Sequence, residues 1–317
     1  MQANHWWLHC CGVLVLIVLA GVLLSPSEAA GKTLDVMTTT EDLAALAREV
    51  GGNHVKVESI ARGYQDPHFV EAKPSYLLKL RDADLLIAVG LELEIGWLPV
   101  LVKDSRNPKI LAGKGYLEAS SNCEILEKPT GQLTRAGGDI HPFGNPHFWL
   151  DPNNGKIMAQ NIAQRLSELD PANANFYQSN LDLFVKRLAD KQKEWEGLVE
   201  PYRGTKIVTY HNSWPNFCKY FGLEVIGYVE PKPGIPPSPS HIFKLVNQMK
   251  EENCRIILME PYFDIKTPKS IAEKTGAKVA VLPPSVGGEK EITDYFTLFD
   301  YDLNLLIKTF NEVGITR

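Results

Sequence analysis

The feature that most constrains the fold is a repeated alternation of short apolar strands with amphipathic helical segments. Helical spacing follows the first strand in EDLAALAREVG, and a longer helical pattern runs from about 292 to 313. Repeated alternation of this kind predicts an α/β fold with parallel or mixed sheets covered by helices on both faces. The strand-like segments are 33–39, 54–59 and 84–90 in the first half, and 206–210, 223–229, 255–260 and 278–282 in the second.

A long segment with a helical pattern separates the two halves. From Pro152 to about Val199 the pattern is almost continuously helical, with a break near Asp170-Pro171. The second piece would extend about 40 Å at 1.5 Å per residue. Such a helix can join two lobes, and the alternative is a long surface helix of one domain. We expect two lobes (31–170 and 201–317), each a central, mostly parallel sheet with flanking helices, joined by a long rigid helix at 171–200.

The N-terminal segment predicts export. Residues 12–24 read GVLVLIVLAGVLL and are followed by the small residues of SPSEAA, as in a secretory signal peptide. We expect residues 1–30 to be removed. The preceding residues contain no Lys or Arg, so an uncleaved membrane anchor remains the alternative. No cysteine lies directly after the apolar run, which argues against lipid attachment.

Charge and cysteine content narrow the choice of partners and bonds. Lys and Arg total 33 against 38 Asp and Glu, a net charge of -5 without a basic stripe, so no nucleic-acid partner is expected. Beyond the signal segment only Cys123, Cys218 and Cys254 remain. These three allow at most one disulfide within the chain, and the spacing leaves its pairing open.

Three histidines occupy similar positions in the predicted fold. His68 lies in YQDPHFVEAKPS, His147 lies in GNPHFWLDP, and His211 directly follows the strand 206–210. Ligands of open α/β sheets gather at the carboxyl ends of strands, where loops bring distant residues together. Neutral imidazoles suit zinc and other transition metals, whereas Mg²⁺ and Ca²⁺ prefer oxygen. A loop histidine is also common as a surface or core residue, so spacing alone leaves both interpretations open.

The residues that follow His147 have structural roles to fill. We expect Phe148 and Trp149 to pack beneath its imidazole. Asp151 precedes a helical pattern, so it can cap that helix or hold an imidazole N–H next to a metal.

The other histidines are expected outside the site. His141 lies in a Gly- and Pro-rich loop and should be exposed to solvent, and transient capture of metal is the alternative. His54 begins a predicted strand. His241 begins a predicted helix that Ser240 could cap.

The order of the motifs resembles a known family. DPHxxxxxPS, NPHFWLDP and the strand-ending YH, with RDADLLIAVGLELE and EKTGAKVAVL, resemble the metal-binding solute receptors of ABC importers, the cluster of zinc uptake receptors and streptococcal adhesin-type lipoproteins. The resemblance extends from about Thr33 to the C-terminus. It implies two α/β lobes joined by a rigid helix and the metal ligands His68, His147 and His211. The third position is His in members resembling zinc receptors and Glu in those resembling manganese receptors, so His211 favours zinc.

The fourth ligand departs from the family pattern. Many members have an aspartate directly after the strand that corresponds to KVAVL, but this chain has Pro283 and Pro284 there. A water, Asp66, Glu260 or Glu289 could complete the site, and the sequence does not choose among them.

The resemblance implies a periplasmic receptor that delivers Zn²⁺ to an ABC permease of the inner membrane, as a monomer without enzymatic activity. A manganese or iron receptor of the same fold is one alternative. The other is an exported zinc enzyme, because three histidines with an open position are also a catalytic arrangement. The first strand lacks a following GxGxxG and the chain lacks GxSxG, which argues against a dinucleotide-dependent dehydrogenase and a serine hydrolase.

Overall fold

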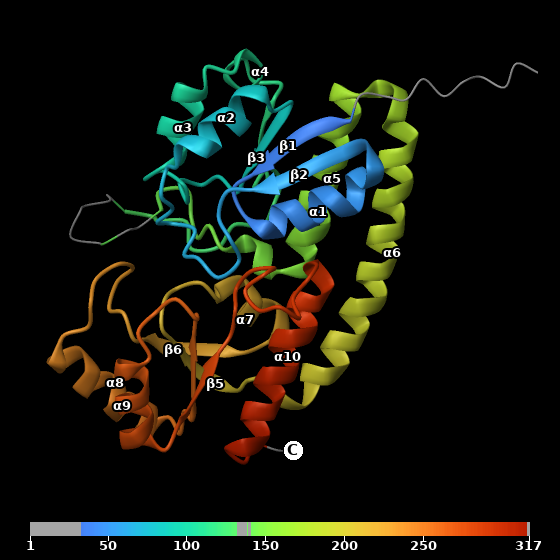
Figure 1. Ribbon diagram of the computed structural model, residues 1–317. Helices are drawn as coiled ribbons and strands as arrows, with labels where there is room; N and C mark the ends of the chain where they lie inside the picture. Colours follow the sequence, from blue (N-terminus) through green and yellow to red (C-terminus); the bar gives the residue numbers. More distant parts are fainter. Residues whose placement is uncertain (1–32, 132–137, 139–140, 316–317) are drawn as a thin grey trace, which may run out of the picture. The chain divides into compact units, whose positions relative to one another are not determined.

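The fold is known from a computed structural model that describes residues 33–131, 138 and 141–315 (Figure 1). These residues belong to one structural unit, Lys32–Arg317. The signal peptide predicted at 1–30 lies outside the described residues. None of the helices formed by the described residues has the length and apolar character that a membrane span requires.

The first sheet has four parallel strands in the order β2-β1-β3-β4. Strand β3 shows why it lies in the middle: all four of its side chains are buried, with Leu85 and Ile87 in one apolar cluster and Leu86 and Ala88 in the other. Helices therefore cover both faces of this sheet (Figure 1). The strands are β1 (Leu34–Thr38), β2 (Val55–Ser59), β3 (Leu85–Ala88) and β4 (Tyr116–Glu118); the helices are α1 (Glu41–Gly51), α2 (Pro74–Asp82), α3 (Leu98–Ser105), α4 (Pro108–Leu111) and α5 (Pro152–Leu169), with short 3-10 turns η1 (Gly52–His54) and η3 (Phe148–Leu150).

The second sheet repeats this topology. Its four parallel strands have the order β6-β5-β7-β8, which is the first sheet's order displaced by four strands. In each sheet the strand order reverses beside the first strand, the kind of place where α/β proteins bind ligands. The strands are β5 (Lys206–Thr209), β6 (Glu224–Tyr228), β7 (Ile256–Met259) and β8 (Lys278–Val281); the helices are α7 (Pro215–Phe221), α8 (Pro239–Glu251), α9 (Lys266–Thr275) and α10 (Tyr295–Glu312).

The long helix α6 (Ala174–Val199) lies between the two sheets in sequence and confirms the predicted connection. Its 26 residues extend about 39 Å. The 3-10 turns η4 (Pro171–Asn173) and η5 (Glu200–Tyr202) flank it. One face packs on α1, α5 and α10, and the indole of Trp195 donates to Asp300 Oδ1 on α10 at 2.7 Å. Helix α6 is therefore supported by contacts along its length. We propose 31–170 and 201–317 as the two lobes that it joins.

Three local details differ from the sequence analysis. Strand β4 was not anticipated, because its three residues are too few to show a period. Five prolines at 230–240 are unfavourable to helix, yet α8 begins at Pro239, since the first turn of a helix tolerates a residue without an N–H. The cap of α8 is Ser238, whose side chain accepts from the His241 N–H, and not Ser240.

The three cysteines of the described residues are free thiols. Cys218 and Cys254 are buried, Cys123 is partly buried, and none of the three forms a disulfide within the described residues.

Candidate metal centre

The loops of the two sheets bring His68, His147 and His211 together. One ring nitrogen from each lies within 4.8 Å of the others. The ring centroids are 5.2 Å apart for His68–His147, 5.4 Å for His68–His211 and 5.5 Å for His147–His211. His147 and His211 are only 2% and 7% exposed. The motifs therefore converge as expected; that they bind a metal stays a prediction.

An oxygen atom orients each of the three imidazoles. Asp66 Oδ1 lies 2.7 Å from Nδ1 of His68, Asn145 Oδ1 lies 3.1 Å from Nδ1 of His147, and Glu230 Oε2 lies 2.8 Å from Nδ1 of His211. These acceptors favour the tautomer with hydrogen on Nδ1 and a lone pair on Nε2. Nε2 of His68 and of His147 is buried without a hydrogen-bond partner. Buried polar atoms are normally satisfied, so this pair marks a place for a ligand.

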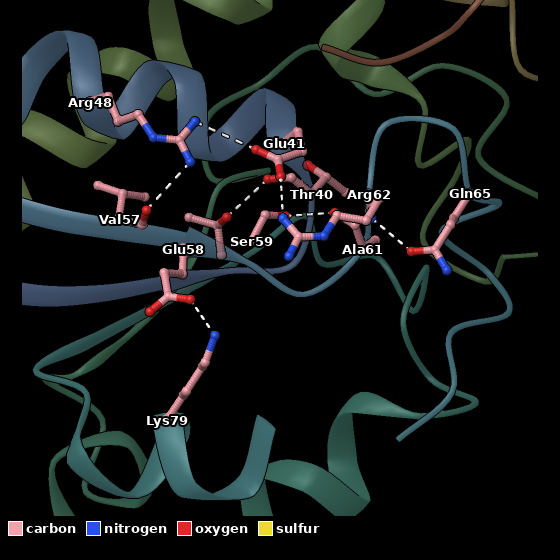
Figure 2. A network of polar contacts seen from close by, with 11 residues as sticks. Thr40, Glu41, Arg48, Val57, Glu58, Ser59, Ala61, Arg62, Gln65 and Lys79 are labelled. Atoms are coloured by element: carbon pink, nitrogen blue, oxygen red, sulfur yellow. Dashed lines mark hydrogen bonds and ion pairs between the residues drawn. The ribbon is translucent and has the colours of Figure 1, made fainter. Parts of the chain in front are cut away.

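The loop that carries His68 is fixed where it leaves β2 (Figure 2). The hydroxyl of Ser59 donates to the Ala61 carbonyl, and the backbone N–H of Arg62 donates to Gln65 Oε1 at 2.8 Å. The guanidinium of Arg62 pairs with Glu41, at the start of α1, at 3.2 Å. Farther along, Asp66 Oδ1 also accepts the backbone N–H of His68 at 2.9 Å, so one oxygen fixes both the chain and the ring.

His147 is held by its neighbours in sequence. Asn145 Oδ1 accepts the backbone N–H of His147 at 2.9 Å, and its amide donates to the Asn212 carbonyl, next to His211, at 2.8 Å. The ring centroid of Trp149 lies 5.3 Å from that of His147, which confirms the predicted packing for Trp149. Asp151 proves to be a helix cap, since Oδ1 accepts the Asn153 N–H at the start of α5 at 2.8 Å.

The surroundings shift the pKa values of His147 and His211 in opposite directions. Burial, followed by the charges of His68, His211 and His141, lowers the pKa of His147 well below its ordinary value. Burial also disfavours protonated His211, but the Glu230 hydrogen bond and the charges of Glu260, Glu230 and Asp66 outweigh it and raise that pKa.

Glu230 was missed by the sequence analysis. It follows β6, and β6 pairs with β5, the strand that His211 follows. The available signal was therefore a carboxylate at the end of a neighbouring parallel strand.

The three carboxylates that could serve as a fourth ligand, Asp66, Glu260 and Glu289, have different surroundings. Asp66 orients His68, and Glu289 is exposed. Glu260 directly follows β7 and is fully buried; Oε1 accepts the Trp214 indole N–H at 3.1 Å, while Oε2 has no partner. Burial raises the pKa of Glu260 to about 7. None of the three belongs to the group of ligand atoms within 4.8 Å.

The expectation that His141 is exposed was wrong. It is half-buried, and its ring centroid lies 5.3 Å from that of His68. Burial, then the charges of His68 and His211, lowers the pKa of His141 to about 4. His141, His147 and His211 line one pocket of about 410 Å³, together with Glu127, Tyr228 and Glu230.

The loop after β8, which contains Pro283 and Pro284, has a structural role. The carbonyl of Pro284 accepts the Trp149 indole N–H at 2.8 Å, which ties the loop after β8 to the chain beneath His147. This hydrogen bond uses a backbone carbonyl, so it does not depend on which side chain stands at position 283 or 284.

The fold and the converging histidines define a two-lobed binding protein with a candidate metal site, and comparison with known proteins gives its family. Residues 36–309 match the family described as "Zinc-uptake complex component A periplasmic". The metal ABC transporter substrate-binding lipoprotein ScbA of Streptococcus cristatus is 30% identical over 95% of this chain and 99% of its own length. The manganese ABC transporter substrate-binding lipoprotein PsaA of Streptococcus pneumoniae is 27% identical over 90% and 92%. The crystal structure of ZnuA, 26% identical, superposes with a TM-score of 0.74 over 87% of this chain and 99% of that one.

The chain therefore belongs to the family of substrate-binding proteins of metal ABC importers. The predicted metal receptor is confirmed at this level, and family membership decides against the alternative of a zinc enzyme. Zinc as the particular metal stays a prediction.

Proposed function

We propose that this protein is an extracytoplasmic zinc receptor in which His68, His147 and His211 bind Zn²⁺ for delivery to an ABC permease of the inner membrane. The observation that carries the proposal is the set of three imidazoles, each with Nδ1 held by an oxygen and with their ligand nitrogens gathered within 4.8 Å. Second-shell oxygens of this kind fix the tautomer that metal binding requires.

The spacing of the rings supports a single tetrahedral ion. Imidazoles that bind one zinc at about 2.0 Å in a tetrahedral shell have ring centres about 5 Å apart. The three centroid distances are 5.2, 5.4 and 5.5 Å. The charge also fits, because Asp66 and Glu230 lie directly behind two of the rings and can balance a divalent cation.

The test is a titration of the metal-stripped protein with Zn²⁺ against a chelator of known affinity. We expect one zinc per chain with nanomolar or tighter affinity, and a large loss for His211→Ala. His54→Ala is the matched control, since His54 packs against Phe176 away from the site. Micromolar binding by the parent, or equal affinities of the parent and His211→Ala, would refute the assignment.

Manganese is the second candidate, because PsaA, a relative over most of this chain, is named as a manganese receptor. Imidazole nitrogen suits zinc, whereas manganese is better served by carboxylate and carbonyl oxygen. In a competition experiment at equal free metal, we expect zinc to displace manganese completely. Preferential retention of Mn²⁺ would identify a manganese receptor and point to Glu260 or Asp66 as a direct ligand.

The proposal includes export to the periplasm by removal of residues 1–30 and function as a monomer. It is supported by the apolar run at 12–24 and by the family's description as periplasmic. Mass spectrometry of the protein in the periplasmic fraction should give a chain that begins near residue 30 or 31. A full-length chain recovered with the membrane would favour the uncleaved anchor. Light scattering checks the monomer.

A further inference from the structure

His141 is placed like a fourth member of the histidine cluster. Its ring centroid is 5.3 Å from that of His68, within the range of 5.2–5.5 Å found among His68, His147 and His211. It is half-buried, and it lines the same pocket as His147 and His211. This spacing places His141 beside the candidate metal ligands rather than on a solvent-exposed part of its loop.

The backbone that faces His141 is unusual. The imidazole of His141 faces the backbone carbonyls of Leu91 and Glu92. These two residues follow β3 and both have left-handed backbone angles, with φ of 56° and 64°. Two successive non-glycine residues in this region are rare and require support from their surroundings.

That support comes from the buried carboxylate of Glu94. Its Oε1 accepts the Val89 N–H at 2.8 Å, its Oε2 accepts the Gly90 N–H at 3.2 Å, and the Thr39 hydroxyl donates to Oε1 at 2.6 Å. The turn is thus held by Thr39, which directly follows β1, and by the backbone N–H groups of Val89 and Gly90. The turn therefore holds the carbonyls of Leu91 and Glu92 beside the imidazole of His141.

The other groups near the site do not compete well for the fourth position. Pro283 and Pro284 have no ligating side chain, and Glu289 is exposed. Asp66 Oδ1 already accepts two hydrogen bonds from His68. Glu260 has one oxygen engaged by Trp214 and, like His141, lies outside the group of ligand atoms within 4.8 Å of one another.

We propose, on the basis of the zinc site proposed above, that His141 is the fourth metal ligand and that the protein binds its ion with four imidazoles. Its ring contacts that of His68 but does not belong to the group of ligand atoms within 4.8 Å, so metal binding must draw the ring toward His147 and His211. Four neutral nitrogen donors increase the preference for zinc over manganese. The carboxylates of Asp66 and Glu230 supply the negative charge from behind the rings.

X-ray absorption of the zinc-loaded protein tests this directly, because imidazole scattering counts the histidines on the metal. We expect four imidazoles in the parent and in His54→Ala, and three with one additional oxygen in His141→Ala. Removal of residues that only orient ligands costs about 10–100-fold in affinity, so loss of a direct ligand should weaken zinc binding at least about tenfold. Three imidazoles in the parent, unchanged in His141→Ala, would overturn the proposal.

A second variant tests the same assignment through metal preference. His141→Asp replaces the fourth nitrogen by a carboxylate, so the ratio of zinc to manganese affinity should fall at least about tenfold. An unchanged ratio would count against His141 as a ligand. Failure of the zinc site itself has a different signature: absence of one-to-one zinc binding by the parent, or insensitivity to His211→Ala.

Discussion

The buried carboxylate of Asp42 gives a sharp prediction about stability. Asp42 lies in the first turn of α1, and its Oδ1 accepts the Val286 N–H from the loop after β8 at 2.9 Å. Its Oδ2 has no partner. Asp302 on α10 is 1% exposed with both oxygens unpartnered, and burial together with the charge of Asp42 raises its pKa well above the ordinary value.

The sign of the effect follows from the pKa of Asp42, which burial raises from 3.8 to about 7. The folded protein therefore retains a proton that the unfolded chain loses. The resulting stabilisation is complete below about pH 4 and is lost as the pH rises toward 7. One pKa unit corresponds to about 1.4 kcal/mol, so the loss is at most about 4 kcal/mol.

Asp42→Asn cannot ionise, and its amide oxygen can still accept the Val286 N–H. We expect the variant to match the parent near pH 4 and to exceed it increasingly as the pH rises, by up to about 4 kcal/mol above pH 7. Urea unfolding at several pH values, with a chelator present, measures this difference. Taking the difference cancels the titration of the histidines, which is common to both proteins.

The exposed Asp104 in α3 provides the control, since Asp104→Asn should change stability little at any pH. If Asp42→Asn and the parent lose stability in parallel from pH 4 to 8, Asp42 is not held protonated and the reasoning fails.

Three further variants probe the site and the contacts that support it. Glu230→Gln should weaken zinc affinity by about 10–100-fold without unfolding the protein, because the carboxylate that orients its histidine becomes neutral; an unchanged affinity in chelator competition would contradict this. Trp149→Phe leaves the Pro284 carbonyl without its donor and should lower the free energy of unfolding by about 1–3 kcal/mol; an unchanged urea midpoint would show that the bond contributes nothing. Gly63→Ala places a Cβ 2.0 Å from the Val286 carbonyl oxygen and should destabilise by about 1–3 kcal/mol; parent-like stability would mean that these loops separate freely.

The sequence by itself predicted most of the elements and the three candidate ligands. Strand and helix periods are local, since they record which face of a short segment is buried, and so the α/β alternation and the long helix could be predicted. The motifs around His68, His147 and His211 are also local, and their place after strands of parallel sheets predicted that they would meet.

Only the tertiary structure decided what surrounds those histidines. Glu230 contacts His211 because β6 pairs with β5. His141 lies beside His68 because its ring packs near the turn after β3. Trp149 meets Pro284 across 135 residues of chain. These contacts join irregular loops, which have no period in the sequence. Their positions follow from how both sheets and α6 pack, so a local pattern cannot specify them.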